Sequence, residues 1–184
     1  MRTRRGGGGH HGIAGEEQVK RRDLVQGVRW VTAALALWSL GVATQAVERL
    51  RKTREEWKAL LPAPAFAVLF DEATEPAGSS PLNGEKREGT FVCAACFLPL
   101  FDSAHKFDSG TGWPSFFDVL PDAVGTRRDF KLILPRKEYH CARCGGHQGH
   151  VFDDGPQPTG LRYCNNGVAL RFVPAGEALP ELRA

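Results

Sequence analysis

The sequence predicts one mainly β domain built from antiparallel strands, with a helix ahead of the strands and a distinct leader at the N-terminus. Short strand-prone stretches separated by turn residues follow one another after Gly89, which is typical of an all-β domain. Strands and helices do not alternate along the chain, so a parallel sheet is not expected. Of the 184 residues, 42% are hydrophobic and 24% charged, a composition that suits one folded domain.

Basic residues are concentrated at the N-terminus. Residues 1–30 hold seven of the 24 Lys and Arg but only three of the 21 Asp and Glu, and the whole chain has a formal net charge of +3. The rest of the chain is therefore nearly neutral and has no basic surplus for contacts with phosphates. We expect no nucleic-acid partner.

The leader, residues 1–46, has the pattern of an export signal. A basic patch from Lys20 to Arg22 precedes a charge-free stretch over 31–44, and small residues follow. The two adjacent arginines followed by Leu24 resemble a twin-arginine signal, which would place the protein in the periplasm or otherwise outside the cytoplasm. An uncleaved membrane anchor needs about 20 apolar residues, which the stretch reaches only if it starts near Gly27. In that case the protein would contact the membrane only through the leader. The third possibility is that this stretch forms a buried helix in a cytoplasmic protein.

The body of the chain, 47–184, is predicted to begin with an amphipathic helix over 47–61. Apolar residues such as Leu50, Trp57 and Leu61 are spaced for one helix face, and Pro62 ends the pattern. The interval from 64 to 89 is rich in Pro, Gly, Ser and Glu and has little periodicity. We predict an ordered loop there.

Six strands are predicted after this loop. Turn signals such as Asp154-Gly155-Pro156 and Asn166-Gly167 separate the strand-prone stretches. The predicted strands span 90–94, 129–134, 138–142, 150–153, 161–165 and 169–173.

Four of the five cysteines form two CxxC pairs, Cys93/Cys96 and Cys141/Cys144. A two-residue spacer lets both thiolates of a pair face one ion, and two such pairs form the tetrahedral Cys₄ set that structural zinc prefers. We therefore expect a structural Zn²⁺ site. Two disulfides, which an exported chain permits, and a dithiol redox motif are the alternatives.

The fifth cysteine, Cys164, has no partner. A free cysteine often packs as an inert small hydrophobe. The neighbours Arg162 and Asn166 favour a reactive thiolate instead, because cationic and hydrogen-bonding groups lower the pKa of a thiol.

Three segments set around the CxxC pairs resemble a methionine-R-sulfoxide reductase of the B type. They are KFDSGTGWPSF over 106–116, HQGHVFDD over 147–154 and RYCNN over 162–166. The resemblance runs from about Trp57 to Pro174 and includes the lead-in segments 74–76 and 80–83. It implies that 47–184 is a reductase domain with two small antiparallel sheets facing each other and zinc held away from the reaction.

The resemblance also implies the reaction. The enzyme would reduce the R epimer of methionine sulfoxide, free or in oxidised proteins, and so repair oxidative damage. Cys164 would attack the sulfoxide sulfur and become a sulfenic acid. Many members of the family carry a second, resolving cysteine where this chain has Thr111. An external thioredoxin- or glutaredoxin-like thiol is therefore expected to restore Cys164, and we expect the chain to act as a monomer.

The site residues that the resemblance implies fall into two groups, and each role has a simpler alternative. The catalytic group is Cys164, His147, His150 and Asn166, and the substrate-binding group is Trp113, Phe152, Arg162 and Asp154. The histidines could instead satisfy buried backbone groups or the zinc loop. The tryptophan could belong to the core, the Arg–Asp pair could be a structural ion pair, and the asparagine could be a turn residue.

Two other functions are compatible with the composition. One is a non-enzymatic zinc module that binds a protein partner, and it would form neither methionine nor a sulfenic acid. The other is a zinc-bearing, thiol peroxidase-like redox protein, which would react with peroxide but would not discriminate between sulfoxide epimers.

Overall fold

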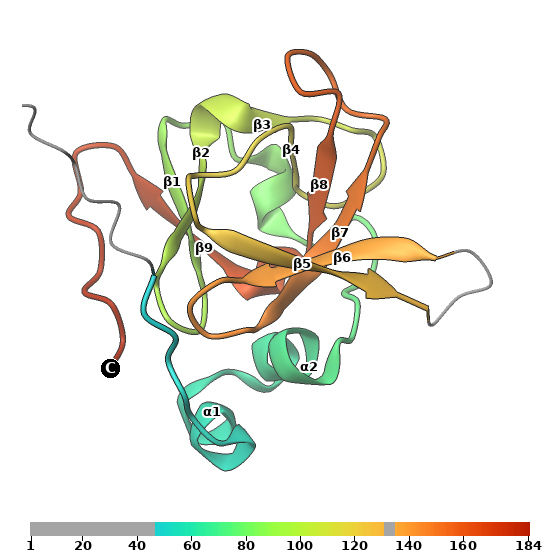
Figure 1. Cartoon of the computed structure of the whole chain (residues 1–184). Coiled ribbons are helices and arrows are strands. Elements are labelled where there is room, and N and C mark those ends of the chain that lie inside the picture. Colours follow the sequence, from blue (N-terminus) through green and yellow to red (C-terminus); the bar gives the residue numbers. More distant parts are fainter. Residues whose placement is uncertain (1–46, 131–134) are drawn as a thin grey trace, which may run out of the picture. The chain divides into compact units, whose positions relative to one another are not determined.

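The computed structural model describes residues 47–130 and 135–184 (Figure 1). The predicted export signal or membrane anchor in residues 1–46 lies outside the described residues, as do residues 131–134. Within the described ranges, no helix has the length and apolar character needed to cross a membrane.

Helix α1 spans Arg54–Leu60, so the predicted helix over 47–61 is wrong for its first seven residues. A capping box sets the start. The Thr53 hydroxyl accepts a hydrogen bond from the Glu56 backbone at 3.2 Å, and the Glu56 carboxylate accepts one from the Thr53 backbone at 2.6 Å. This reciprocal pair satisfies two backbone N–H groups at the helix start, and the apolar spacing before Thr53 does not extend the helix.

Helix α2, Ala63–Asp71, lies where the sequence predicted a loop. Pro64 lies in the first turn of this helix, where its missing N–H costs nothing. Phe66, Val68 and Leu69 are buried, and the ring of Trp57 from α1 stacks on Phe70 with centroids 5.2 Å apart. The loop prediction was therefore wrong for this stretch, and the rest of the interval contains only a short 3₁₀ turn, η1, at Pro81–Gly84.

The strands form two antiparallel sheets, which confirms the predicted fold class. The first sheet has the order β2-β1-β9 and contains β1 (Gly89–Cys93), β2 (Pro99–Asp102) and β9 (Leu170–Pro174). The second has the order β3-β4-β8-β7-β6-β5. Its strands are β3 (Lys106–Phe107), β4 (Ser115–Phe116), β5 (Val124–Asp129), β6 (Arg136–Cys141), β7 (His147–Phe152) and β8 (Arg162–Asn165).

One strand prediction differs from the structure. The strand predicted over 129–134 shares only Asp129 with β5, and 131–134 lie outside the described residues. Strand β5 is polar and largely exposed because it is the last strand of its sheet. An edge strand carries charged residues that protect its free side, so it lacks the apolar alternation from which strands are predicted.

Aromatic side chains from both sheets fill the space between them. Phe101 of β2 stacks on Phe116 of β4 with centroids 4.0 Å apart, and Phe91 of β1 meets the same ring edge-on at 4.9 Å. Tyr139 of β6 packs edge-on against Phe101, and all four side chains are fully buried. The two sheets therefore face each other across one core, as expected.

Candidate active site and metal centre

Strand β8 places Cys164 in the middle of the larger sheet. Cys164 lies opposite Ser115 of β4 on one side and His150 of β7 on the other. The neighbouring position on β7 is Gly149, where a Cβ atom would lie 1.8 Å from the Cys164 carbonyl oxygen. Only glycine allows this close approach of the two backbones.

A cavity of about 130 Å³ opens beside Cys164. Five of the eight predicted site residues line it, and four other residues complete its wall. The predicted residues are Trp113, His150, Phe152, Cys164 and Asn166, and the others are Thr74, Arg136, Gly149 and Asn165. The cavity has an aromatic wall and a polar wall, and its volume suits one side chain.

The thiol of Cys164 does not have the lowered pKa that its sequence neighbours suggested. Burial raises the pKa of Cys164, and the Arg162 guanidinium and a hydrogen bond from the Thr111 hydroxyl offset this only in part. The hydroxyl is held in turn by Ser109 at 2.8 Å, which also contacts Ser115 at 2.8 Å. The resting site therefore holds a thiol that a few donors are ready to stabilise as a thiolate.

We expect alkylation of Cys164 by iodoacetamide to accelerate about tenfold per pH unit between roughly pH 6 and 8, because only the thiolate reacts. The raised pKa of Cys164 keeps the thiolate a minor form throughout this range. Mass spectrometry of the peptide that contains Cys164 would measure the rate. The isosteric variant Thr111→Val should react more slowly at each pH, and a rate independent of pH would contradict the prediction.

The two histidines are oriented by separate carboxylates. His147 Nδ1 lies 2.7 Å from Glu138 Oε1, and both side chains are buried, while Arg127 also binds Glu138. His150 Nε2 lies 2.8 Å from Asp129 Oδ2.

Only His150 lines the cavity. His147 lies behind it, with ring centroids 5.4 Å apart. Burial lowers the pKa of His150, and the hydrogen bond to Asp129 opposes this only in part.

Asn166 is held from two directions. Its Oδ1 accepts a hydrogen bond from the Glu75 backbone at 3.0 Å, and its Nδ2 donates to the Gln148 carbonyl at 3.0 Å. An amide nitrogen carries two hydrogens, so one remains for another acceptor.

Glu75, for which the sequence predicted no role, holds two residues of the cavity wall, Asn166 and Trp113. Its carbonyl also accepts the Trp113 indole N–H at 3.0 Å, and its carboxylate accepts from the backbones of Gly167 and Val168. A buried acid with a fixed set of donors is not visible from sequence spacing, since the donors lie about 90 residues away.

Arg162 and Asp154 form a two-bond ion pair rather than part of the cavity wall. The Arg162 Nε and Nη2 atoms each lie 2.8 Å from one Asp154 oxygen, and the pair lowers the pKa of Asp154. The guanidinium carbon lies 4.3 Å from the Phe152 ring centroid. The pair thus supports Phe152 from behind and brings positive charge toward Cys164.

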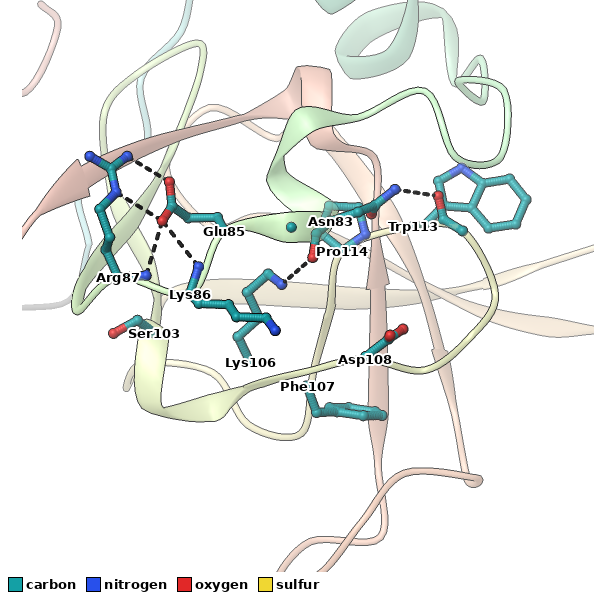
Figure 2. Close-up of a pocket in the computed structure, with 12 residues that line it drawn as sticks. Asn83, Glu85, Lys86, Arg87, Ser103, Lys106, Phe107, Asp108, Trp113 and Pro114 are labelled. Carbon is teal, nitrogen blue, oxygen red and sulfur yellow. Dashed lines mark hydrogen bonds and ion pairs between the residues drawn. The ribbon is translucent and has the colours of Figure 1, made fainter.

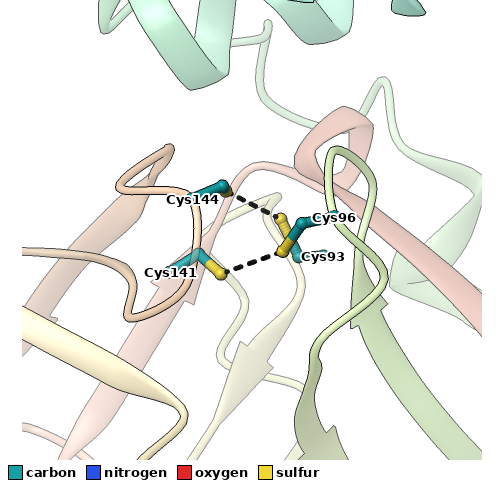
Figure 3. A group of neighbouring side chains, drawn as sticks. All are labelled: Cys93, Cys96, Cys141 and Cys144. Atoms are coloured by element: carbon teal, nitrogen blue, oxygen red, sulfur yellow. Dashed lines mark hydrogen bonds between the residues drawn. The ribbon is translucent and has the colours of Figure 1, made fainter. Parts of the chain in front are cut away.

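The four paired cysteines come together as predicted (Figure 3). Their sulfur atoms all lie within 4.8 Å of one another, with Cys93 Sγ 3.7 Å from Cys144 Sγ and Cys96 Sγ 3.5 Å from Cys141 Sγ. A tetrahedral ion with Zn–S bonds of about 2.3 Å separates its sulfur ligands by about 3.8 Å, whereas a disulfide needs about 2.05 Å. The cluster can therefore hold one metal ion.

Similar local turns build both halves of the cluster. The backbone N–H of Phe97 donates to Cys93, and that of Gly145 donates to Cys141, each at 2.9 Å. Both donors have positive φ angles, 64° and 73°. Glycine adopts this conformation without strain, whereas a phenylalanine there is unusual.

Gln148 connects the cluster with the cavity. Its side-chain Nε2 lies 3.5 Å from Cys93 Sγ, and its backbone carbonyl accepts a hydrogen bond from Asn166 Nδ2. One residue of β7 thus contacts both sites.

Comparisons with known proteins agree with this geometry. Residues 61–174 match the family model of the SelR domain. The chain is similar to proteins named "Peptide methionine sulfoxide reductase MsrB". Identity is 49% with that of Pseudomonas putida (strain W619) over 70% of this chain and 97% of the relative. It is 47% with that of Methanosarcina mazei over 70% and 92%, and 48% with that of Methanosarcina barkeri over 71% and 91%. A crystal structure of the Mis18 "Yippee-like" domain matches 50% of this chain and 100% of its own length, with 20% identity and a TM-score of 0.38.

Proposed function

The chain belongs to the SelR domain family of peptide methionine sulfoxide reductases, and we propose that it reduces the R epimer of methionine sulfoxide to methionine. The substrate is the free amino acid or an oxidised methionine in a protein. The observation that carries this proposal is the convergence of Trp113, His150, Phe152 and Asn166 on the half-buried Cys164 around one cavity of about 130 Å³. Each of these residues then has a task in the reaction.

The aromatic wall orients the substrate. Trp113 is fixed through its indole N–H, so its ring presents a rigid apolar face to the S-methyl group. Phe152 closes the opposite part of the cavity, and the Arg162–Asp154 pair keeps it in place.

The polar wall handles the sulfoxide oxygen. The second N–H of Asn166 donates to this oxygen as negative charge develops on it, which lowers the barrier. The Nε2–H of His150 is directed at Asp129, so His150 donates to the oxygen from Nδ1 in its protonated form. His147 acts through His150 and does not itself contact the substrate. Glu138 fixes the ring of His147, which packs against the ring of His150. His147 is a positioning residue.

The chemical step is an oxygen transfer between two sulfur atoms. The Cys164 sulfur attacks the sulfoxide sulfur, the S–O bond to the substrate breaks, and the oxygen ends on Cys164 with the proton that the thiol has lost. Methionine leaves, its sulfur reduced by two electrons, and Cys164 becomes a sulfenic acid, oxidised by two electrons.

A thiol from outside the chain must complete the cycle. The other four cysteines lie together in the cluster. At the position where other members of the family carry a resolving cysteine, this chain has the hydroxyl of Thr111, which contacts Cys164. A thioredoxin- or glutaredoxin-like thiolate therefore has to reach the Cys164 sulfur directly.

We assign the ion of the cluster as Zn²⁺, held by Cys93, Cys96, Cys141 and Cys144. Bound by four thiolates, zinc supplies folding free energy and has no open position for substrate. The donor set fits, because the four sulfur atoms are thiols at the spacing a tetrahedral ion needs and three of the cysteines are buried. The reaction itself runs on the residues around Cys164.

The export of the protein and its monomeric state are proposals from the sequence alone. Residues 1–46 carry the twin-arginine pattern that supports export. An exported enzyme of this kind would act on oxidised proteins outside the cytoplasm.

A single-turnover experiment tests the function and its mechanism together. The full chain is incubated with each epimer of a blocked methionine sulfoxide and no added thiol, and methionine is counted. We expect a burst of about one methionine per chain from the R epimer only, because one nucleophile reacts once. Intact mass should show a dimedone adduct at Cys164.

The Thr111→Cys variant is the matched comparison. The Thr111 hydroxyl already contacts the Cys164 sulfur, so the introduced thiol should form a disulfide with Cys164 and remove the dimedone adduct. No methionine from either epimer would reject the enzyme in favour of a binding module. Equal bursts from both epimers would reject the stereochemistry, and a wild-type disulfide to a cluster cysteine would reject the external thiol.

A further inference from the structure

A second and larger cavity shares Trp113 with the cavity around Cys164. It measures about 610 Å³ and lies between the segment after η1 and the segment from β3 to β4 (Figure 2). The residues that matter here are Glu85, Lys86, Arg87, Lys106, Asp108 and Trp113. The two cavities therefore lie next to each other at Trp113.

Glu85 and Arg87 neutralise each other inside this cavity. Arg87 Nη2 lies 2.6 Å from Glu85 Oε2 and Arg87 Nε lies 3.0 Å from Oε1, which also accepts both backbone N–H groups of 86 and 87. The side-chain hydrogen bonds from Arg87 are the main reason that the pKa of Glu85 falls to about 2. The charge of this carboxylate is already balanced by Arg87, and four hydrogen bonds hold it in place.

Two lysines in the same cavity have no such partner. Figure 2 shows the side chains of Lys86 and Lys106 in the stretch of cavity between the Glu85–Arg87 pair and Trp113. Lys106 Nζ donates to the Asn83 carbonyl at 2.9 Å, and neither ammonium forms an ion pair with the described residues. An ammonium has three donors, so both lysines have donors to spare.

The charge around Lys106 is only partly balanced. Burial lowers the pKa of Lys106, and attraction from Asp108 opposes this. One oxygen of Asp108 already accepts the Gly110 backbone N–H at 2.9 Å. The ammonium of Lys106 is partly buried and donates to one neutral acceptor, so a carboxylate in addition to Asp108 would stabilise its charged form.

We propose that this cavity binds the stretch of an oxidised protein that flanks the methionine sulfoxide, and that Lys86 and Lys106 select an acidic residue in that stretch. The inference rests on the proposed function. A space of about 130 Å³ takes the sulfoxide side chain alone, so the polypeptide has to extend beyond it, and the cavity that shares Trp113 is adjacent. A space of about 610 Å³ is large enough for several further groups.

The test compares blocked peptides that carry one R-methionine sulfoxide and either Glu or Gln at successive positions on either side of it. The readout is the ratio of kcat/KM for the Glu peptide to that for the Gln peptide, with dithiothreitol as reductant. At the preferred position we expect a ratio of about five in the wild-type enzyme at low salt. The ratio should fall as salt screens the charges.

The variants Lys86→Gln and Lys106→Gln should each bring the ratio toward one. Lys58→Gln is the matched control, since this exposed lysine lies on α1 away from the cavity, and its ratio should equal that of the wild type. Because the readout is a ratio within one protein, a variant with reduced stability still reports on the preference.

The proposal is overturned if no position favours Glu, or if the preference survives in both cavity variants. Reduction of blocked methionine sulfoxide by the wild type is measured alongside. If that activity is present while the charge preference is absent, only the subsite fails. If that activity is absent, the proposed function itself fails.

Discussion

The Cys164→Ser variant is expected to lose at least about a thousandfold in methionine formation, because the hydroxyl that replaces the thiol is a far weaker nucleophile at neutral pH. The substitution changes one atom in a half-buried position of β8. Backbone pairing with Ser115 and His150 does not depend on that atom. Methionine release from the R epimer in the presence of dithiothreitol is the measurement.

The fold and the metal content of this variant should equal those of the wild type. Cys164 contributes no ligand to the four-cysteine cluster, so elemental analysis should still find about one zinc per chain, as a closed structural site holds one ion. Turnover close to the wild-type rate would end the assignment of Cys164 as the nucleophile. Loss of both zinc and structure would mean that the variant had tested stability instead.

Replacing a cluster cysteine should instead reduce the metal content and the stability of the protein. In Cys93→Ser or Cys141→Ser, three ligands remain in a site whose ion stabilises the fold. We expect metal release and a fall in Tm of about 10 °C or more, the size that a loss of several kcal/mol produces in a domain of this length. Thermal unfolding and elemental analysis of the same samples check this.

Cys164→Ser is the matched control for these two variants, since all three replace one cysteine by serine. A fall in Tm confined to the cluster variants would support the structural metal. Absence of zinc from the wild type, together with disulfides Cys93–Cys96 and Cys141–Cys144, would contradict it. The structure favours the metal because its closest sulfur contacts run across the two pairs, from Cys93 to Cys144 and from Cys96 to Cys141.

Features with a local signature could be predicted from the sequence. The CxxC spacing brings two ligands to one side of a turn, so the four-cysteine cluster was predictable before its geometry was known. Short strand-prone stretches bounded by turn residues likewise predicted β1, β6, β7, β8 and β9. The polar edge strand β5 and the helix α2, which begins with two prolines nearby, lack such signatures.

Features that depend on packing could not be predicted. The neighbours of Cys164 in sequence suggested a lowered pKa, yet burial by other segments has the larger effect. Glu75 carried no signal of its own, because its partners Trp113, Asn166 and Gly167 come from distant parts of the chain. Arg136 and Thr74 line the cavity for the same reason.

The contacts of Glu75 also bear on how the protein reaches its native state. The bond from its backbone to Asn166 spans 91 residues and that from its carboxylate to Val168 spans 93, while β1 pairs with β9 at the far end of the domain. Contacts of such long separation form late, since a large loop must close first. A growing chain has therefore made Glu75 and Trp113 long before Asn166 and Val168 can complete the frame around Cys164. We therefore expect the site to become competent only after nearly the whole domain has been made.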